Sequence, residues 1–420
     1  DQLPQLLHDL TRTPHRRTRR SEAKGPDAGA LRQRLAELAA AEREQALLEI
    51  VVRHAAVILG HSGPEDIDPE RDFLEAGFDS LSAMELRKEL AAALGVSLPP
   101  LVVFDNKNPL GLAAYLTDEL ATAAPVNGDA APARQSTPGA ETLSDFFRMA
   151  VTSNEVQKGL TLLRSVADIR PRFTSAAEVD RVPEPVRLAS GTRTPRLICF
   201  STPMATGGVH QHARLVANFQ GSHHISGLPT PGFALGESLP ATAEAAVEVM
   251  ARSVLLAAED EPFVLLGYSS GGTLGYSTAR HLEQVHGVRP AGVVLLDTYQ
   301  VSEAGGGAMS QVFNGLAYGL LERESMFGQF DSARLTAMAR YADLQHTFDL
   351  GPVTAPVLFV RAEEPFEGSG GNPQDPDGWQ ATAWDPAHTV RTAPGTHFTI
   401  VEDRADTTTG IVKEWLAELE

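Results

Sequence analysis

Cysteine is almost absent from this chain, since Cys199 is the only one among 420 residues. A single cysteine excludes an internal disulfide framework and any metal site built from several cysteines. We therefore expect no bound metal and a reducing setting, which by default is cytoplasmic.

Positive charge is also scarce. The chain has 35 Lys and Arg against 54 Asp and Glu, which gives a formal net charge of −19. Such an acidic surface repels nucleic-acid phosphates and anionic lipid, so we expect no nucleic-acid binding and no membrane-surface binding. The one basic run, residues 15–20, is interpreted as a solvated linker, with a binding patch as the alternative.

Long uncharged apolar runs are missing as well. No stretch approaches the ~18 residues of a membrane span, and the most apolar early segment, residues 47–59, contains Glu49, Arg53 and His54. The first residues do not form the charged start and apolar stretch of a signal peptide. The chain begins with Asp1 rather than Met, which predicts a fragment of a longer protein.

What the sequence does contain indicates several domains. A length of 420 residues corresponds to two to four domains at about 100–200 residues each. Residues 1–40 are predicted as a linker, and residues 41–120 carry short helical patterns that indicate a small all-α bundle. Residues 121–141 are rich in Ala, Pro, Gly and Thr and lack apolar periodicity, which predicts a flexible tether. Residues 142–420 form the second folded part.

This second part begins with two helices, after which strands and helices alternate. Two apolar helical patterns cover residues 142–170, with a capping box expected at 152–155 between them. Strand-like apolar runs then alternate with helical stretches, which is typical of a mostly parallel α/β sheet. The predicted strands are 197–200, 263–267, 293–296, 357–360 and 389–392. A helical insertion at about 303–346 is expected to form a lid over the strand ends.

The strongest chemical signal is the sequence GYSSG at residues 267–271, between a predicted strand and a helical pattern. A strand, a Gly-x-Ser-x-Gly turn and a helix form a nucleophile elbow, in which a sharp turn exposes a serine hydroxyl. If Ser270 were the central serine, residue 268 would be a glycine, but it is Tyr268. Ser269 is therefore the predicted nucleophile.

A serine hydroxyl needs a base to remove its proton, and that base needs an orienting carboxylate. In the elbow architecture the chain order is Ser, then an acid, then His. Asp297 ends the strand-like run after Ser269, and His397 lies between the last predicted strand and the closing helix. Alone, Asp297 reads as a helix cap and His397 as an ordinary surface or core residue. Their joint order and placement favour a Ser269–His397–Asp297 triad.

Two backbone N–H groups are predicted to stabilise the oxyanion of a tetrahedral intermediate. Ser270 supplies one, because the N–H after the nucleophile faces this site. The other is expected from the loop after the first core strand, where Pro203 has no N–H and Met204 is the candidate. The alternative is that residues 201–208 are only a glycine-rich connection.

A second serine, Ser80, is followed at once by a helical pattern. Ser80 or Asp79 fits the N-cap of that helix. The same position suits a phosphodiester on Ser80, because a helix N-terminus presents free N–H groups and a positive dipole end. The residues alone favour the cap and leave the phosphodiester open.

Two motifs carry a resemblance to a known family. The sequence GFDSL at 77–81, with VFD at 103–105, resembles an acyl carrier protein. The region from Thr142 onward is similar to the chain-terminating thioesterase of modular type I polyketide synthases. The resemblance covers nearly the whole chain and implies an all-α carrier bundle followed by an α/β-hydrolase domain with a helical lid.

The resemblance also implies roles for particular residues. It implies 4′-phosphopantetheine attached to Ser80 and an acyl-enzyme on Ser269. A tyrosine shortly after the triad aspartate faces the family's substrate channel, and Tyr299 occupies that position. Tyr268, which stands where histidine is common in the family, is also assigned to the substrate channel. Residues 142–170 resemble the family's dimerisation helices, and residues 1–40 resemble the linker that leaves an upstream ketoreductase.

The function that we expect is release of a polyketide chain. The chain, carried as a thioester on Ser80, is transferred to Ser269 and leaves as a macrolactone when its own hydroxyl attacks. Hydrolysis to the free acid is the first alternative, and an inactive carrier and dimerisation scaffold is the second. The implied partners are a polyketide acyl chain, upstream synthase domains, a phosphopantetheinyl transferase and a second copy of this chain.

Overall fold

The computed structural model describes residues 28–122, apart from short gaps between 60 and 107, and residues 142–299, 316–317, 319–321, 331–365 and 388–419. The basic run at 15–20, nearly all of the predicted tether and much of the predicted lid lie outside the described residues. Within the described part of the chain, no helix is both long enough and apolar enough to cross a membrane.

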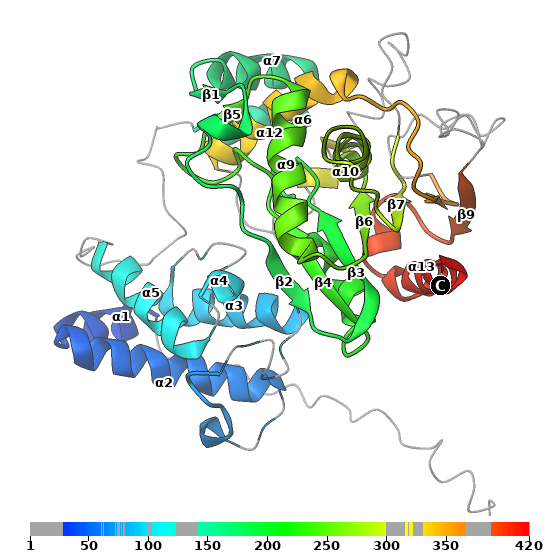
Figure 1. The fold of residues 1–420 in the computed structure, drawn as a ribbon. Coiled ribbons are helices and arrows are strands. Elements are labelled where there is room, and N and C mark those ends of the chain that lie inside the picture. The colour runs from blue at the N-terminus through cyan, green and yellow to red at the C-terminus, as the bar shows by residue number, and fades with distance from the viewer. Residues whose placement is uncertain are drawn as a thin grey trace, which may run out of the picture.

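The first folded part is a small helical bundle (Figure 1). Its helices are α1 (Ala28–Glu37), α2 (Ala40–Leu59), α3 (Ser80–Leu94), α4 (Val102–Asp105) and α5 (Pro109–Thr122). Apolar residues three or four positions apart face inward, so Leu47 and Val51 of α2 and Leu86 and Leu90 of α3 are fully buried. Leu35 of α1 is buried in the same core, although α1 lies within the stretch predicted as a linker.

The second folded part contains a seven-stranded sheet with the order β2-β4-β3-β6-β7-β8-β9, in which β2 alone is antiparallel to its neighbour. The strands are β2 (Val186–Ala189), β3 (Arg193–Phe200), β4 (His223–Leu228), β6 (Phe263–Tyr268), β7 (Gly292–Leu296), β8 (Val357–Ala362) and β9 (Thr389–Ala393). The five predicted strands are all present, whereas β2 and β4 had no counterpart in the prediction. Two-residue strands β1 (Arg172–Phe173) and β5 (Leu239–Pro240) pair separately.

Helices cover both faces of the sheet, because alternate strand residues point to opposite sides. On one face, Ile198, Leu265 and Val293 pack with α9 (Ala243–Ala258) and α10 (Ser270–His281). On the other, Leu197, Val264 and Val294 pack with α8 (Ala213–Ala217) and α13 (Ala405–Leu419). Because β3, β6, β7 and β8 run parallel, their carboxyl ends lie at one edge of the sheet, where loops converge (Figure 1).

Two helices precede the sheet, α6 (Leu143–Thr152) and α7 (Val156–Ala167), and the capping box expected between them does not form. Thr152 is the last residue of α6, and its hydroxyl donates to the carbonyl of Arg148. The capping box lies instead at the start of α6, between Thr142 and Asp145. The prediction of 152–155 was wrong because the helix continues through the threonine that was expected to cap its successor.

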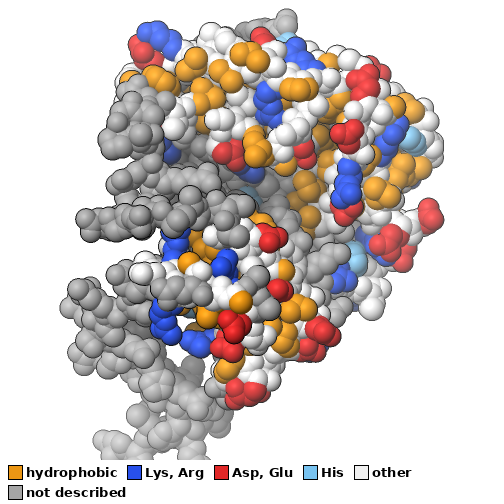
Figure 2. Space-filling view, turned by 90° about the vertical axis from the view of Figure 1, so that its left-hand side faces the viewer, with side chains coloured by type: hydrophobic (Ala, Val, Ile, Leu, Met, Phe, Trp, Pro, Cys, Tyr) orange, Lys and Arg blue, Asp and Glu red, His pale blue; other side chains and the backbone are white. Residues whose placement is uncertain are grey.

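Helices α6 and α7 and the residues that follow them carry both buried and exposed apolar side chains. One face packs with α12 (Ser332–Leu344), and it buries Phe147 and Leu163. Other apolar side chains are not covered: Phe146 and Met149 of α6 are 42% and 51% exposed, and Ile169, which follows α7, is 82% exposed. Figure 2 shows hydrophobic side chains spread over the upper part of the molecule, which is the end that carries α7 in Figure 1.

Candidate active site

Ser269 lies in a sharp turn between β6 and α10. Its backbone has φ +54° and ψ −134°, a region that non-glycine residues rarely adopt, and its N–H donates to the Leu296 carbonyl at 2.9 Å. Two glycines allow the close packing of this turn: a Cβ on Gly267 would lie 2.4 Å from the Gly272 Cα, and a Cβ on Gly272 would lie 2.0 Å from the Thr298 hydroxyl. These features are those of a nucleophile elbow.

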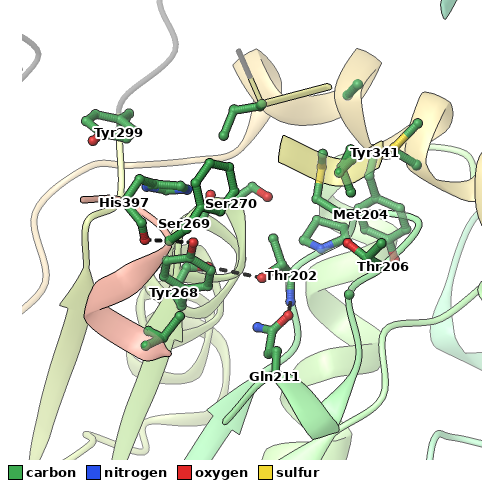
Figure 3. Close-up of a pocket in the computed structure, with 18 of the residues that line it drawn as sticks. Thr202, Met204, Thr206, Gln211, Tyr268, Ser269, Ser270, Tyr299, Tyr341 and His397 are labelled. Carbon is green, nitrogen blue, oxygen red and sulfur yellow. Dashed lines mark hydrogen bonds between the residues drawn. The ribbon is translucent and has the colours of Figure 1, made fainter. Parts of the chain in front are cut away.

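Asp297 and His397 are brought together from positions 100 residues apart. The His397 Nδ1 lies 2.7 Å from the Asp297 Oδ2, and both side chains are almost completely buried. The Ala362 N–H donates to the other carboxylate oxygen at 3.0 Å. Because the carboxylate accepts the Nδ1 proton, the Nε2 of His397 is left to act as a base. Ser269 and His397 line the same pocket, and they lie close together in Figure 3.

Two tyrosines contact this histidine and its carboxylate. The Tyr268 ring lies 4.9 Å from the His397 ring, and its hydroxyl donates to the His397 carbonyl at 2.8 Å. The Tyr299 hydroxyl donates to the Asp297 Oδ2 at 2.5 Å. Burial, and then the Asp297 charge, raise the pKa of Tyr299, so the phenol stays protonated. The resemblance predicted that Tyr299 faces the substrate channel, but its hydrogen bond to Asp297 was not predicted. The one sequence signal for that bond is that the two residues are two positions apart.

The loop after β3 lines the pocket opposite His397 (Figure 3). The Thr202 N–H donates to the Gln211 Oε1 at 3.2 Å. The N–H of Met204, predicted to donate to the oxyanion, donates to the Thr202 carbonyl at 2.7 Å in a tight turn. Met204 therefore stays a prediction that requires this N–H to be shared or released. Ser270, the other predicted donor, is the first residue of α10.

The pocket is lined mainly by apolar side chains. They come from the loop after β3, from the insertion, from α12 and from the loop after β9: Pro203, Met204, Leu316, Leu320, Met338, Tyr341, Ala342, Phe398 and Val401. Of the predicted lid, residues 316–317, 319–321 and 331–346 are described, and Leu316, Leu320 and Met338 reach the pocket. Polar side chains such as Gln211, Gln345 and Glu402 also line it, but most of the surface that faces the pocket is apolar, so the pocket is suited to an apolar chain with one reactive end.

The described part of the chain holds no group of three His, Cys, Asp or Glu residues that would bind a metal ion. Cys199 is buried in β3, and burial raises the pKa of its thiol to about 12, so it is no nucleophile.

Ser80 is the first residue of α3, a helix of 15 residues whose first turn contains no acidic side chain. The backbone N–H groups at such a helix start suit a phosphodiester, and no carboxylate in this turn opposes it. Asp79 and Gly77 lie outside the described residues. The residues present therefore fit a phosphopantetheine attached to Ser80.

Comparison with known families agrees with this arrangement. The family model described as "Thioesterase domain" matches residues 195–416, which is more than half of the chain. The chain belongs to the thioesterase domain family. The model described as "Phosphopantetheine attachment site" matches residues 49–116, so the thioesterase is preceded by an acyl carrier domain that carries phosphopantetheine. The sheet with its elbow and covering helices is an α/β-hydrolase fold.

Several curated relatives of this carrier and thioesterase pair are polyketide synthases. Polyketide synthase GfsE of Streptomyces halstedii is 38% identical across 99% of this chain. The spectinabilin polyketide synthase system protein NorC of Streptomyces orinoci is 36% identical across 95%, and erythronolide synthase EryA3 of Saccharopolyspora erythraea is 33% identical across 89%. The chain spans 11%, 17% and 11% of the length of these relatives.

Solved thioesterase structures are similar at lower identity. The wild-type Vlm2 thioesterase domain is 22% identical and covers 56% of this chain and 98% of its own, with a TM-score of 0.39. The NocB thioesterase domain from the nocardicin cluster is 18% identical and covers 55% of this chain and 95% of its own, with a TM-score of 0.42.

Proposed function

We propose that this carrier and thioesterase pair releases a polyketide chain by macrolactonisation through Ser269. The observation that supports the proposal most directly is the 2.7 Å contact between the His397 Nδ1 and the Asp297 Oδ2, beside a strained Ser269 in an apolar pocket. A nucleophile, a base and an orienting acid in this order are what acyl transfer requires.

The first half of the reaction transfers the acyl chain to the enzyme. His397 takes the Ser269 hydroxyl proton through Nε2 while the oxygen attacks the thioester carbonyl. Asp297 stabilises the imidazolium that forms, and backbone N–H groups of Ser270 and Met204 stabilise the oxyanion. The C–S bond then breaks, and the proton passes from His397 to the sulfur. An ester on Ser269 remains.

The second half releases the chain. His397 removes a proton from the hydroxyl at the far end of the chain, that oxygen attacks the ester carbonyl, and Ser269 recovers its proton. Tethering favours this internal hydroxyl over water, because effective molarities of well-oriented groups reach about 10⁵ M or more. The apolar lining from Leu316, Leu320 and Met338 supports this outcome because it disfavours water beside the ester. Hydrolysis by water at the same step is the alternative.

The carrier domain has a separate task. The phosphopantetheine arm, when bound, supplies a thiol that holds the acyl chain as a thioester. Ser80 is the residue that we assign to it, and the acid-free first turn of α3 supports that assignment. The partners would be a phosphopantetheinyl transferase and the upstream domains of a polyketide synthase, as the relatives that contain such domains suggest.

A second copy of this chain is also proposed as a partner, through residues 142–170. The support is the exposed apolar set of Phe146 and Met149 in α6 and Ile169 just after α7, none of which belongs to the cluster that packs with α12. Replacing Phe146 and Met149 by Ser is expected to convert a dimer into a monomer in light scattering. A wild-type chain that is monomeric at micromolar concentration would refute this interface.

The test of release is the mass of the product. A synthetic hydroxy-acyl thioester of a small thiol is incubated with the whole chain, and the products are identified by mass spectrometry. Macrolactonisation gives a product lighter than the acid by one water. The acid alone would overturn lactonisation for that substrate and favour the hydrolytic alternative.

Two variants test the roles of the two serines independently. Ser269→Ala is expected to abolish product formation and labelling by a fluorophosphonate, while a transferase still loads Ser80. Ser80→Ala is expected to lose that loading and to keep turnover of the soluble thioester. A wild-type chain that the fluorophosphonate does not label would instead support the inactive scaffold, and loss of both activities in Ser80→Ala would refute the division between two sites.

A further inference from the structure

Three successive backbone carbonyls in the loop after β3 accept hydrogen bonds from side chains. The Arg334 Nε donates to the Ala205 carbonyl at 2.6 Å, and another nitrogen of the same guanidinium donates to the Gly207 carbonyl. Between them, the Thr206 carbonyl faces the His210 Nε2 at 3.1 Å. Burial and the Arg334 charge lower the pKa of His210 to about 3, so this imidazole is neutral and donates from Nε2.

Arg334 reaches this loop from a distant element. It lies in the first turn of α12, where its N–H donates to the Asp331 side chain at 2.7 Å. Its guanidinium carbon lies 5.6 Å from the centre of the Phe233 ring. Burial lowers the pKa of Arg334 and the Asp331 charge opposes this, so the side chain remains a cation. Within the described residues, its donors go to carbonyls of the 205–207 loop rather than to a carboxylate partner.

The two elements joined by Arg334 both line the proposed active site, and they pack against each other, because Ala205 and Met338 share one apolar cluster. The loop contributes Thr202, Met204 and Gly207 to the pocket, and α12 contributes Met338 and Tyr341. Each peptide unit is planar, so the held carbonyls of Ala205 and Thr206 also fix the N–H groups of Thr206 and Gly207. The Gly207 N–H in turn donates to the Met204 carbonyl at 2.8 Å, which connects the anchored peptides to the residue predicted to donate to the oxyanion. A guanidinium is suited to this task because its donors form a rigid fork.

We propose that Arg334 is a positioning residue that couples the helix α12 to the loop containing the predicted oxyanion donor. Arg334 would hold the 204–208 backbone in the orientation that stabilises the tetrahedral intermediate, and only when α12 is seated over the pocket. The proposal rests on the proposed function, since it assigns a task within that same reaction.

Arg170 provides a matched control. It also anchors α12, through the Ala333 carbonyl at 2.8 Å and the Thr336 hydroxyl at 2.9 Å, and its other nitrogen donates to the carbonyls of Gly232 and Glu237. Arg170 therefore ties the same helix to a different loop. Removing Arg170 loosens α12 without deleting a donor to residues 205–207.

The experiment compares Arg334→Ala, Arg334→Lys and Arg170→Ala in the whole chain. Two quantities are measured: kcat and KM for a soluble acyl thioester, and affinity for an alkyl boronic acid, which forms a tetrahedral adduct with a reactive serine. For Arg334→Ala we expect kcat to fall about 10- to 100-fold, with KM within about threefold, because small misplacement at a reacting centre has effects of this size. Boronate affinity should fall in parallel. Arg334→Lys replaces the guanidinium by a single ammonium group, so it should retain part of the kcat and part of the boronate affinity.

Hydrogen exchange of the backbone amides at 204–208 completes the test, because it does not depend on turnover. Faster exchange there in Arg334→Ala but not in Arg170→Ala supports the proposal even in a chain that releases no product. Equal kcat losses in Arg334→Ala and Arg170→Ala, or a rise in KM alone, would overturn it. If Arg334→Ala does not fold, Arg334→Lys decides: unchanged kcat and unchanged exchange would refute the coupling.

Discussion

Ser80 and Ser269 both lie at the start of a helix, but the surroundings of the two helix starts differ. Ser80 opens α3 in the carrier domain, with no acidic residue in the first turn. Ser269 precedes α10 with φ +54°, and α10 is buried from Gly271 to Ala279. The first setting offers a helix N-terminus to an incoming group, whereas the second forces a hydroxyl out of a densely packed core.

The comparison indicates what each serine requires from its fold. A modification site needs access and a favourable dipole, which one helix end supplies. A nucleophile needs a base, an orienting acid and a rigid backbone, which here come from β6, β7 and the loop after β9. Substitutions in the thioesterase domain should therefore affect chemistry at Ser269 and leave loading of Ser80 unchanged.

The largest expected effect comes from Asp297→Asn. The amide is neutral and has one accepting oxygen, whereas the carboxylate accepts through both, from the His397 Nδ1 and from the Ala362 N–H. The imidazole therefore loses the stabilisation of its charge and its fixed orientation. We expect kcat for a soluble thioester to fall about 10³- to 10⁴-fold. Transferase loading of Ser80, measured by intact mass, should be unchanged. A loss below tenfold would contradict the role assigned to Asp297.

Packing of the elbow is tested by Gly272→Ala. The added Cβ would lie 2.0 Å from the Thr298 hydroxyl, a buried group beside Asp297. Overpacking at such a position costs about 1–3 kcal/mol or more, and we expect a lower melting temperature together with a roughly 100-fold lower kcat.

Gly410 in α13 is the matched control for this substitution. A Cβ there meets nothing within 4 Å, and alanine is favoured over glycine inside a helix by about 1 kcal/mol. Gly410→Ala should therefore raise the melting temperature and leave kcat unchanged. Equal effects of the two substitutions would show that the elbow is not close-packed.

Acid should destabilise the thioesterase domain more than the carrier domain. Burial lowers the pKa of His212 to about 4 and, together with Arg334, that of His210 to about 3. The unfolded chain binds protons at these positions near pH 6.5 and the folded chain does not, so stability falls as pH falls below 6.5. At pH 5 the loss is about 2 kcal/mol for each histidine. The described carrier residues contain no fully buried histidine.

Thermal unfolding at pH 7.5 and pH 5.0 measures this loss, and His212→Gln isolates one contribution. Glutamine keeps a donor for the Phe200 carbonyl, which lies 3.0 Å from the His212 Nε2, but it does not titrate. The variant should therefore lose less stability between the two pH values than the wild type. The same loss in both proteins would refute a buried neutral His212.

The smallest expected effect comes from Tyr299→Phe. It removes the hydroxyl that donates to the Asp297 Oδ2 and leaves the donors from His397 and Ala362. A hydrogen bond to a charged group contributes about 1.5–3 kcal/mol, part of which water recovers here, so we expect kcat/KM to fall about tenfold. An unchanged kcat/KM would limit Tyr299 to lining the pocket.

Several elements were predictable because their residues carry their own signal. The runs that became β6, β7 and β8 are apolar and fully enclosed by helices, so composition alone identified them. The strand β4 was not predicted because it contains the polar residues His223 and Ser226, which are buried. The strand β2 was not predicted because it is only four residues long. Buried polar strand residues depend on tertiary partners that the local pattern does not reveal.

The same distinction applies within the site. Ser269, Asp297 and His397 were named from their order and their positions after predicted strands, and the structure brings the last two to 2.7 Å. The Arg334 contacts had no such signal, because a guanidinium bound to carbonyls more than 120 residues away leaves no motif. Backbone acceptors occur at every position, so sequence cannot say which one a side chain selects.

The bond from the Tyr268 hydroxyl to the His397 carbonyl crosses 129 positions of the chain. It joins the residue just before the nucleophile to the loop after β9, so these two segments are not independent modules. A chimera that takes β6 and the elbow from a relative without a tyrosine at position 268, and keeps its own last segment, would leave the His397 loop without this anchor. Exchange of release domains between synthases should therefore keep β6 and the loop after β9 from the same parent.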